Sequence, residues 1–185
     1  DAREIYQPPQ WQQLECALMD RLDHHSGDKE QQMDVLRQFQ QQEIFRLLAM
    51  DFQDLLPLEK LGDHLSHLAD LILSQVLKLC WKNLRRRHRE EPIFAIISYG
   101  KLGGRELGYA SDLDLIFLYQ DDHPDAQEIY ARLGKSINTM LGGYTTCGRL
   151  YETDLRLRPN GESGLLVSSL EAFSDYQKNH AWVWE

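Results

Sequence analysis

Apolar residues recur at helical spacing through residues 1–90. In residues 11–22 and again in residues 33–52 they return every three or four positions, which is the period of an amphipathic helix. Pro57 interrupts this pattern, and a longer apolar stripe then runs over residues 58–87. The sequence therefore predicts three helices that each bury one face. The apolar positions are Trp11, Leu14, Leu18 and Leu22, then Leu36, Phe39, Ile44, Leu47 and Leu48, then Leu61, Leu65, Leu68, Val76 and Leu79.

After Pro92 the pattern changes to short runs of β-forming residues separated by turns. Residues 93–99 predict a buried strand, residues 112–119 a second strand, and the alternating residues 150–158 a third. We therefore predict an α+β fold, a mixed sheet with flanking helices preceded by a helical region. The remaining predicted elements are a helix over residues 125–141, a short strand over 165–169, and a helix over 169–179 capped by Ser168 or Ser169.

The boundary between these two parts falls at residues 90–92, where the period of the apolar residues changes. The apolar stripes of residues 1–90 need a partner surface. We therefore expect the helical region to pack on residues 91–185, which form the α+β core, and not to behave as a free domain.

Composition narrows the class of protein. The chain has 185 residues, is 42% hydrophobic and carries a formal net charge of −9, which disfavours binding to nucleic acid. The only basic cluster, residues 85–89, is explained by a solvated helix C-terminus. Cys16, Cys80 and Cys147 fit neither a zinc site nor a disulfide framework. We expect a cytoplasmic protein that does not span or bind a membrane, because no apolar run approaches the length of a membrane span.

Two carboxylates mark the start of the second predicted strand. Asp112 and Asp114 share one face of that strand, about 7 Å apart, and Leu113 points to the other face. Such a pair is costly unless a cation lies between its members, and oxygen ligands without His or Cys favour Mg²⁺. If the third strand is a neighbour, Asp154 completes a set of three carboxylates. Such a set can hold two metal ions for an in-line phosphoryl displacement.

A glycine turn separates the first two predicted strands. Gly103 and Gly104 precede a short helix expected from Arg105, and a turn of this kind lets backbone N–H groups approach a phosphate. Lys101, Arg156 and Arg158 supply positive charge for a polyphosphate. Each feature alone has a simpler explanation: a solvated strand end, a hairpin turn, or a surface pair between Asp154 and Arg156.

Together, the glycine pair, the D-x-D and the later strand with a carboxylate resemble the nucleotidyltransferase superfamily that includes polymerase-β-like enzymes. The phrases "YGKLGGRELGYASDLDLIFLY", "LYETDLRLRPNGESGLLV" and "EAFSDYQKNHAWVWE" are similar to the bifunctional glutamine synthetase adenylyltransferase/adenylyl-removing enzymes. "ELGYASDLDL" and "DYQKNHAWVWE" favour the C-terminal, adenylylating domain of that family. The similarity covers nearly the whole chain, without the C-terminal helices that follow in the family.

The resemblance implies a role for each residue that matches the family's motifs. Two Mg²⁺ ions would be held by Asp112, Asp114 and Asp154, and Asp154 would also accept the proton of the nucleophile. The triphosphate of ATP would lie on Gly103 and Gly104, near Lys101 and Ser111, with Arg156 and Arg158 on the nucleotide or pyrophosphate. The family turn usually reads G-x-G-K-L-G-G, and here Ser98 replaces its first glycine.

The reaction implied is transfer of AMP from ATP to a tyrosine hydroxyl of glutamine synthetase, which regulates nitrogen assimilation. The family also implies control by a PII-type signalling protein. Three alternatives stay open. They are the deadenylylating reaction, in which phosphate releases ADP; a module that senses ATP without catalysis; and a nucleic-acid polymerase of the same superfamily, which the acidic charge disfavours.

Overall fold

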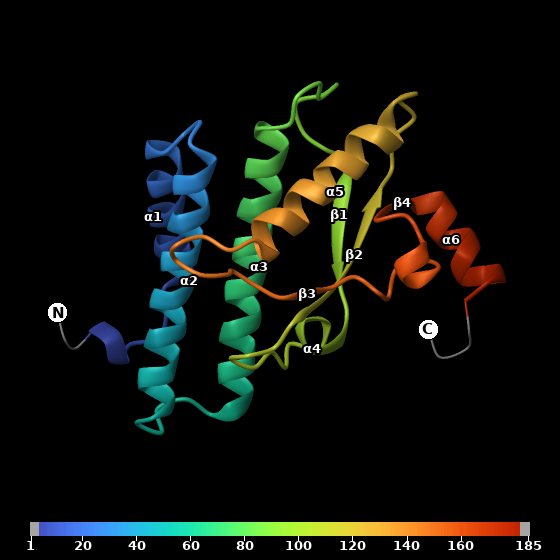
Figure 1. Ribbon diagram of the computed structural model, residues 1–185. Helices are drawn as coiled ribbons and strands as arrows, with labels where there is room; N and C mark the ends of the chain where they lie inside the picture. Colours follow the sequence, from blue (N-terminus) through green and yellow to red (C-terminus); the bar gives the residue numbers. More distant parts are fainter. Residues whose placement is uncertain (1–3, 182–185) are drawn as a thin grey trace.

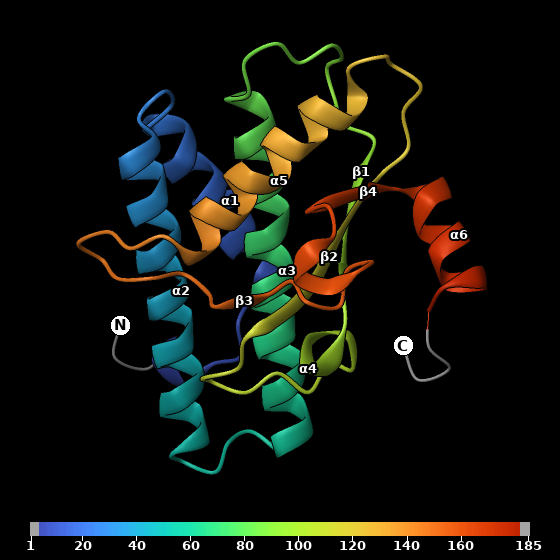
Figure 2. The ribbon, with the colours of Figure 1, turned by 45° about the vertical axis from the view of Figure 1, so that its right-hand side comes forward.

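The computed structural model describes residues 4–181 and contains a helical layer beside a small mixed sheet (Figure 1). The view turned by 45° shows helix α5 crossing over α3 on its way from the sheet toward α2 (Figure 2). The fold is α+β, as the sequence predicts. In chain order its elements are η1 (Glu4–Tyr6), α1 (Trp11–His24), α2 (Lys29–Asp51), α3 (Leu58–Lys82), β1 (Phe94–Ser98), α4 (Gly100–Gly103), β2 (Leu113–Tyr119), α5 (Ala126–Gly142), β3 (Thr153–Asp154), η2 (Gly161–Ser163), β4 (Val167–Ser169) and α6 (Leu170–Asn179).

The helical region forms three helices close to the predicted bounds. Asp28 caps α2 by accepting a hydrogen bond from the Gln31 N–H, and Pro57 lies directly before α3. The third helix was predicted too long, because it ends at Lys82 and Arg86 takes a left-handed conformation with φ 65°. The basic residues 85–89 therefore lie in the loop after α3, and their interpretation as a helix C-terminus is wrong.

Strand β2 is the centre of the four-stranded sheet and pairs with each of the other three. It runs antiparallel to β1 and parallel to β3 and β4. β3 pairs with the first two residues of β2, and β4 pairs with its last three. The third strand predicted over residues 150–158 is therefore wrong in length: only Thr153 and Asp154 have strand geometry.

Strand β1 differs from the buried strand that its apolar sequence predicts. It pairs only with β2 among the described strands, and its side chains alternate between partly buried and exposed. Ile97 is 36% exposed and Ile93, just before the strand, is 47% exposed. Composition alone cannot separate such an edge strand from a buried one, because both are rich in β-branched residues.

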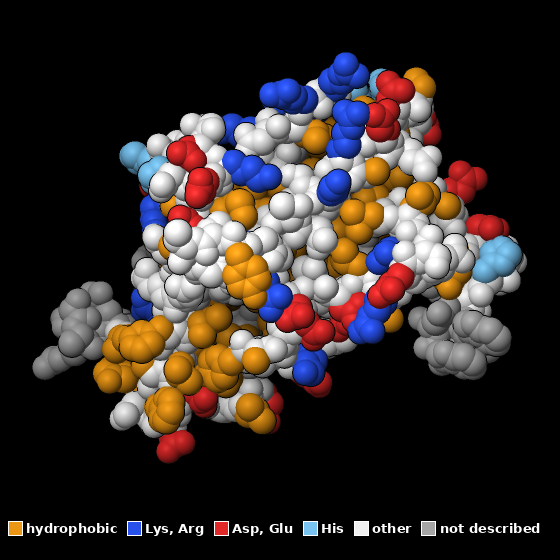
Figure 3. Space-filling model, viewed as in Figure 1, with side chains coloured by type: hydrophobic (Ala, Val, Ile, Leu, Met, Phe, Trp, Pro, Cys, Tyr) orange, Lys and Arg blue, Asp and Glu red, His pale blue; other side chains and the backbone are white. Residues whose placement is uncertain are grey.

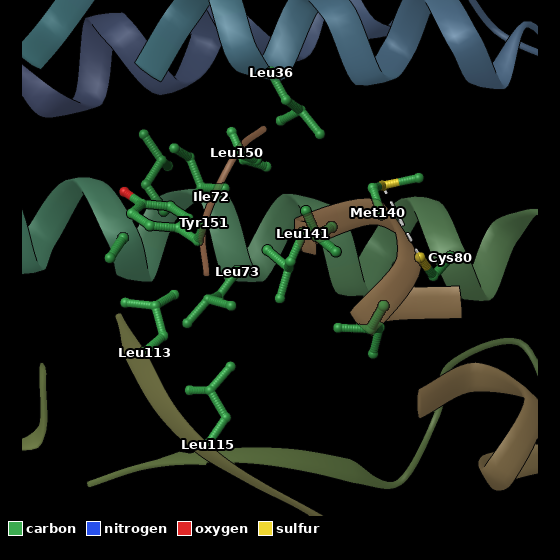
Figure 4. Close-up of a cluster of buried hydrophobic side chains, with 14 of the residues drawn as sticks. Leu36, Ile72, Leu73, Cys80, Leu113, Leu115, Met140, Leu141, Leu150 and Tyr151 are labelled. Carbon is green, nitrogen blue, oxygen red and sulfur yellow. Dashed lines mark hydrogen bonds between the residues drawn. The ribbon is translucent and has the colours of Figure 1, made fainter. Parts of the chain in front are cut away.

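One hydrophobic core joins the helices to the sheet. Figure 4 shows Leu36 of α2, Ile72 of α3 and Leu113 of β2 pointing into the same cluster. All three side chains are 0% exposed. Cys80 and Met140 bring their sulfur atoms to 4.0 Å across the α3–α5 contact. None of the described helices is long and apolar enough to cross a membrane.

The buried carboxylate of Asp121 joins the loop after α3 to the C-terminal end of β2. Asp121 is 4% exposed; its Oδ2 lies 2.7 Å from His88 Nε2 and accepts a hydrogen bond from the Tyr130 hydroxyl at 2.8 Å. Arg89 lies 3.4 Å away. Burial alone would raise the pKa of Asp121, but hydrogen bonds from Tyr130, the His123 N–H and His88 lower it to about 2.

We expect Asp121→Asn to reduce the free energy of unfolding by about 2 kcal/mol at pH 7, which is the value of this pKa shift. A carboxylate with a lowered pKa stabilises the fold above its unfolded pKa, and that contribution is lost as the pH falls through the folded pKa. The difference between wild type and variant should therefore shrink between about pH 4 and pH 2. Urea unfolding at pH 7 and pH 2.5 measures it, and a difference that does not change with pH would contradict the assignment.

Candidate active site

The predicted carboxylates come together through the pairing of β2 with β3. In this parallel ladder Leu113 lies opposite Thr153, and Asp114 lies opposite Asp154. The Leu113 N–H donates to the Glu152 carbonyl at 2.9 Å, which extends the pairing by one residue. Asp112 directly precedes β2. All three carboxylates therefore lie at the N-terminal end of β2, and the face of β2 that carries Leu113 and Leu115 is buried.

A one-turn helix lies against this end of β2. Helix α4 begins at Gly100, which has φ 54°, a conformation that favours glycine. A Cβ added at Gly100 would lie 2.1 Å from Oδ2 of Asp114. The turn thus supports the Asp114 carboxylate directly. Sequence reasoning missed Gly100 as a site residue, although it is a glycine of the turn that carried the resemblance.

Gly103 and Gly104 lie at the end of α4, and the helix expected from Arg105 is absent. Arg105 has φ 58°, which ends the turn. The Gly103 N–H donates to the Tyr99 carbonyl at 3.0 Å, and the Gly104 N–H donates to the Gly100 carbonyl at 2.9 Å. A Cβ at Gly103 would lie 2.8 Å from the Ser98 carbonyl oxygen, so close packing requires this glycine.

The other predicted residues of this turn are close to the site but do not enter its cavity. Lys101 is exposed on α4 and near enough to Asp114 to lower the pKa of that carboxyl group. Ser111 accepts a hydrogen bond from the Gly108 N–H at 3.0 Å, which closes the turn before Asp112. The described contact of Ser111 is therefore a local one.

The two predicted arginines have different partners. The Arg156 side chain binds both carboxylate oxygens of Asp154, with its Nε 3.0 Å from Oδ1 and 2.9 Å from Oδ2. Arg158 instead donates to the carbonyls of Leu155 at 2.6 Å and Glu162 at 3.1 Å. Arg158 therefore supports the turn after β3, while Arg156 forms the ion pair considered as the simpler explanation of Asp154.

An open cavity of about 540 Å³ lies beside the carboxylates. Over β3, above α4, acidic and basic side chains alternate on the surface (Figure 3). Sequence reasoning missed Asn138, which accepts a hydrogen bond from the Thr153 hydroxyl at 2.7 Å, because nothing near it in the sequence marks a site. The cavity is lined by Asp112, Asn138, Glu152, Thr153, Asp154, Leu155, Arg156, Arg158 and Glu162.

The carboxylates influence one another electrostatically. The pKa of Asp114 is raised, first by burial and then by the negative charges of Asp112 and Asp154. The pKa of Asp154 is lowered by its hydrogen bonds from Arg156. Opposite shifts in two facing carboxyl groups are typical of acid–base sites and of structural ion pairs.

The donor set suits a hard divalent cation. Three carboxylates without His or Cys provide the oxygen ligands that Mg²⁺ prefers, and the charges of Asp112 and Asp154 add to the effect of burial in raising the pKa of Asp114. Within residues 4–181, however, no three acidic, His or Cys side chains are placed to hold a metal ion together. Asp154 would have to turn from Arg156 toward Asp114 to complete the set.

Carboxylates on two adjoining parallel strands, beside a glycine turn and arginines, are the arrangement that the sequence resemblance to nucleotidyltransferases implies. The family model described as glutamate-ammonia ligase adenylyltransferase matches residues 1–185. Proteins named bifunctional glutamine synthetase adenylyltransferase/adenylyl-removing enzyme are 59% identical to the chain in Nitrosomonas eutropha and 55% identical in Aromatoleum aromaticum. These matches cover 96% and 100% of the chain. The chain belongs to the glutamate-ammonia ligase adenylyltransferase family.

The chain spans about a fifth of the length of these curated relatives, 20% in both cases. Their name joins two activities, addition and removal of an adenylyl group.

Proposed function

We propose that this chain transfers AMP from ATP to a tyrosine hydroxyl of glutamine synthetase and releases pyrophosphate. The observation that carries the proposal is the parallel pairing of Asp114 with Asp154 beside Asp112. This pairing supports the proposal because three carboxylates on adjoining strands could hold the metal ions for an in-line displacement at the α-phosphorus once Asp154 turns from Arg156. The names of the relatives support the choice of acceptor protein.

Each site residue has a role in this reaction. Asp154 accepts the proton of the tyrosine hydroxyl as its oxygen bonds to the α-phosphorus and the bond to pyrophosphate breaks. Arg156 moves from Asp154 to the polyphosphate, which restores the basicity of Asp154. Lys101 adds positive charge from α4. Mg²⁺ held by the three carboxylates would neutralise the charge that develops on the phosphates.

The phosphate contact at the glycine turn is assigned to the start of α4. Gly103 and Gly104 use their N–H groups inside the turn, whereas the first N–H groups of any helix lack an intrahelical partner. We therefore place the triphosphate at Gly100 and Lys101, with Gly103 and Gly104 providing the tight packing that the turn requires. Ser111 stabilises the turn that leads into Asp112 through its hydrogen bond from the Gly108 N–H.

We prefer adenylylation to removal of the adenylyl group because "ELGYASDLDL" resembles the adenylylating domain of the family. The carboxylates serve either direction, so the acceptor that lies in line with the α-phosphorus decides the reaction. The proposal includes a cytoplasmic location and regulation through a PII-type protein, as the family implies. A module that only senses ATP is disfavoured by the three intact carboxylates.

The test uses ATP labelled at the α-phosphate, Mg²⁺ and unmodified glutamine synthetase. We expect label on the synthetase, and no label when the γ-phosphate carries it instead. In a parallel reaction, phosphate and adenylylated synthetase should give little ADP. Faster ADP release than AMP transfer at equal protein concentration would favour the removing reaction, and ATP binding without either product would favour a sensor.

A further inference from the structure

The loop between α5 and β3, residues 143–152, is held by polar side chains of α2. Both ribbon views show this loop extending from the end of α5 across to α2 (Figures 1 and 2). Arg37 Nε donates to the Gly148 carbonyl at 2.7 Å, and Gln41 Nε2 donates to the Cys147 carbonyl at 2.8 Å. Gln40 Nε2 donates to the Leu150 carbonyl at 2.5 Å. Arg37, Gln40 and Gln41 are therefore the side chains of α2 that hold this loop.

Arg37 fixes the beginning and the end of the loop at once. Its side chain is completely buried, and besides Gly148 it donates to the carbonyls of Met140 and Gly143. No described carboxylate hydrogen-bonds to it, and burial lowers its pKa, with Asp34 opposing at longer range. A buried cation satisfied by carbonyl groups has few alternative positions, because any movement leaves it or the carbonyls without a partner.

Gln40 continues this contact toward the site. It is 6% exposed, and the Leu150 carbonyl to which it donates directly precedes Tyr151, which is 9% exposed. Leu150 and Tyr151 both point into the core in Figure 4. The chain is thus fixed up to Tyr151, three residues before Asp154.

The length of β3 makes this support necessary. β3 has only two residues. Apart from the ion pair of Asp154 with Arg156, its described attachments are the ladder to β2 and the hydrogen bond of Thr153 to Asn138. So short a strand positions a side chain weakly by itself, whereas a catalytic constellation must be held within about 0.5 Å. The position of Asp154 therefore depends on the loop that leads into β3.

We infer that Arg37, Gln40 and Gln41 are positioning residues, which set the place of Asp154 by holding the loop before it. The inference rests on the proposed function in giving Asp154 a catalytic role. The inference gives a structural role to the glutamines at residues 40–42 of α2, which the packing of the helix does not require. The helical region then supports the site through the hydrogen bonds of α2 to the loop before β3, in addition to covering the sheet.

The experiment compares Gln40→Met with Gln75→Met in the full chain. Both glutamines are buried, 6% and 4% exposed, and each donates one side-chain hydrogen bond, Gln40 to the loop and Gln75 to Glu15. The first measurement is amide hydrogen exchange at Tyr151 and Asp154. The second is the affinity for Mn²⁺, followed by electron paramagnetic resonance with and without ATP. Thermal unfolding of both variants checks that they lose similar stability.

We expect Gln40→Met to speed exchange at these amides at least tenfold and to weaken Mn²⁺ binding about tenfold. Gln75→Met should leave both within about twofold of wild type. Exchange and affinity that change equally in the two variants would overturn the inference, because the effect would then be general destabilisation. Wild type without any Mn²⁺ affinity would contradict the proposed function, and the exchange data would still decide the inference. Gln41→Ala against its exposed neighbour Gln42→Ala gives a second pair if Gln40→Met does not fold.

Discussion

Replacing Asp114 with asparagine is expected to reduce AMP transfer roughly a thousandfold while the protein still folds. The loss follows from removing one carboxylate from the set that stabilises developing charge, an effect of about 4 kcal/mol on the transition state. Folding survives because burial and the charges of Asp112 and Asp154 raise the pKa of Asp114. Removing that charge relieves repulsion in the metal-free protein.

Two measurements check this prediction. Transfer of labelled AMP gives the activity, and thermal unfolding followed by circular dichroism gives the stability. Asp122→Asn is the control, because Asp122 is exposed beyond the opposite end of β2 and should retain full activity. An Asp114→Asn variant that keeps more than a tenth of the wild-type rate would refute the role of these carboxylates.

Gly100→Ala is expected to reduce activity about a hundredfold and to lower the free energy of unfolding by about 1–2 kcal/mol. The loss of stability arises because an alanine at φ 54° is strained. The loss of activity arises because the new methyl group would lie 2.1 Å from Oδ2 of Asp114, so that the carboxylate must turn away. Activity assays and urea unfolding separate the two effects.

Gly27→Ala is the matched control for Gly100→Ala. Gly27 also has a positive φ, 89°, but a Cβ there would meet no atom within 4 Å. The control should therefore lose comparable stability and keep its activity. If both variants lose activity in the same proportion, backbone strain alone explains the effect, and the contact between Gly100 and Asp114 has no catalytic importance.

The sequence predicts well wherever a regular period is present. The apolar stripes give α1, α2 and the start of α3, and the alternation around Leu113 correctly separates the buried face of β2 from the carboxylates. The sequence argument required only that the third strand be a neighbour of the second, and the pairing of Asp114 with Asp154 fulfils this condition; the parallel direction of the pairing was not predicted. The division at residue 90 stays a prediction.

Other features of the site could not be predicted, because long-range contacts decide them. The alternation over residues 150–158 is typical of a strand, yet the backbone leaves the sheet after Asp154 as Arg156 folds back onto that carboxylate. The contact of Gly100 with Asp114 depends on a turn geometry that composition does not encode. The hydrogen bonds of Arg37 join α2 to a loop that no local pattern links to it.

The same hydrogen bonds join parts of the chain that lie far apart in sequence. Arg37 meets carbonyls 103 to 111 positions away, whereas β1 and β2 are neighbours in sequence and their pairing ends beside Asp114, whose carbonyl accepts from the Tyr99 N–H. Contacts between distant residues form late, because the entropy of closing a long loop must first be overcome. We therefore expect the loop before β3 to become ordered after the β1–β2 pair, and Asp154 with it.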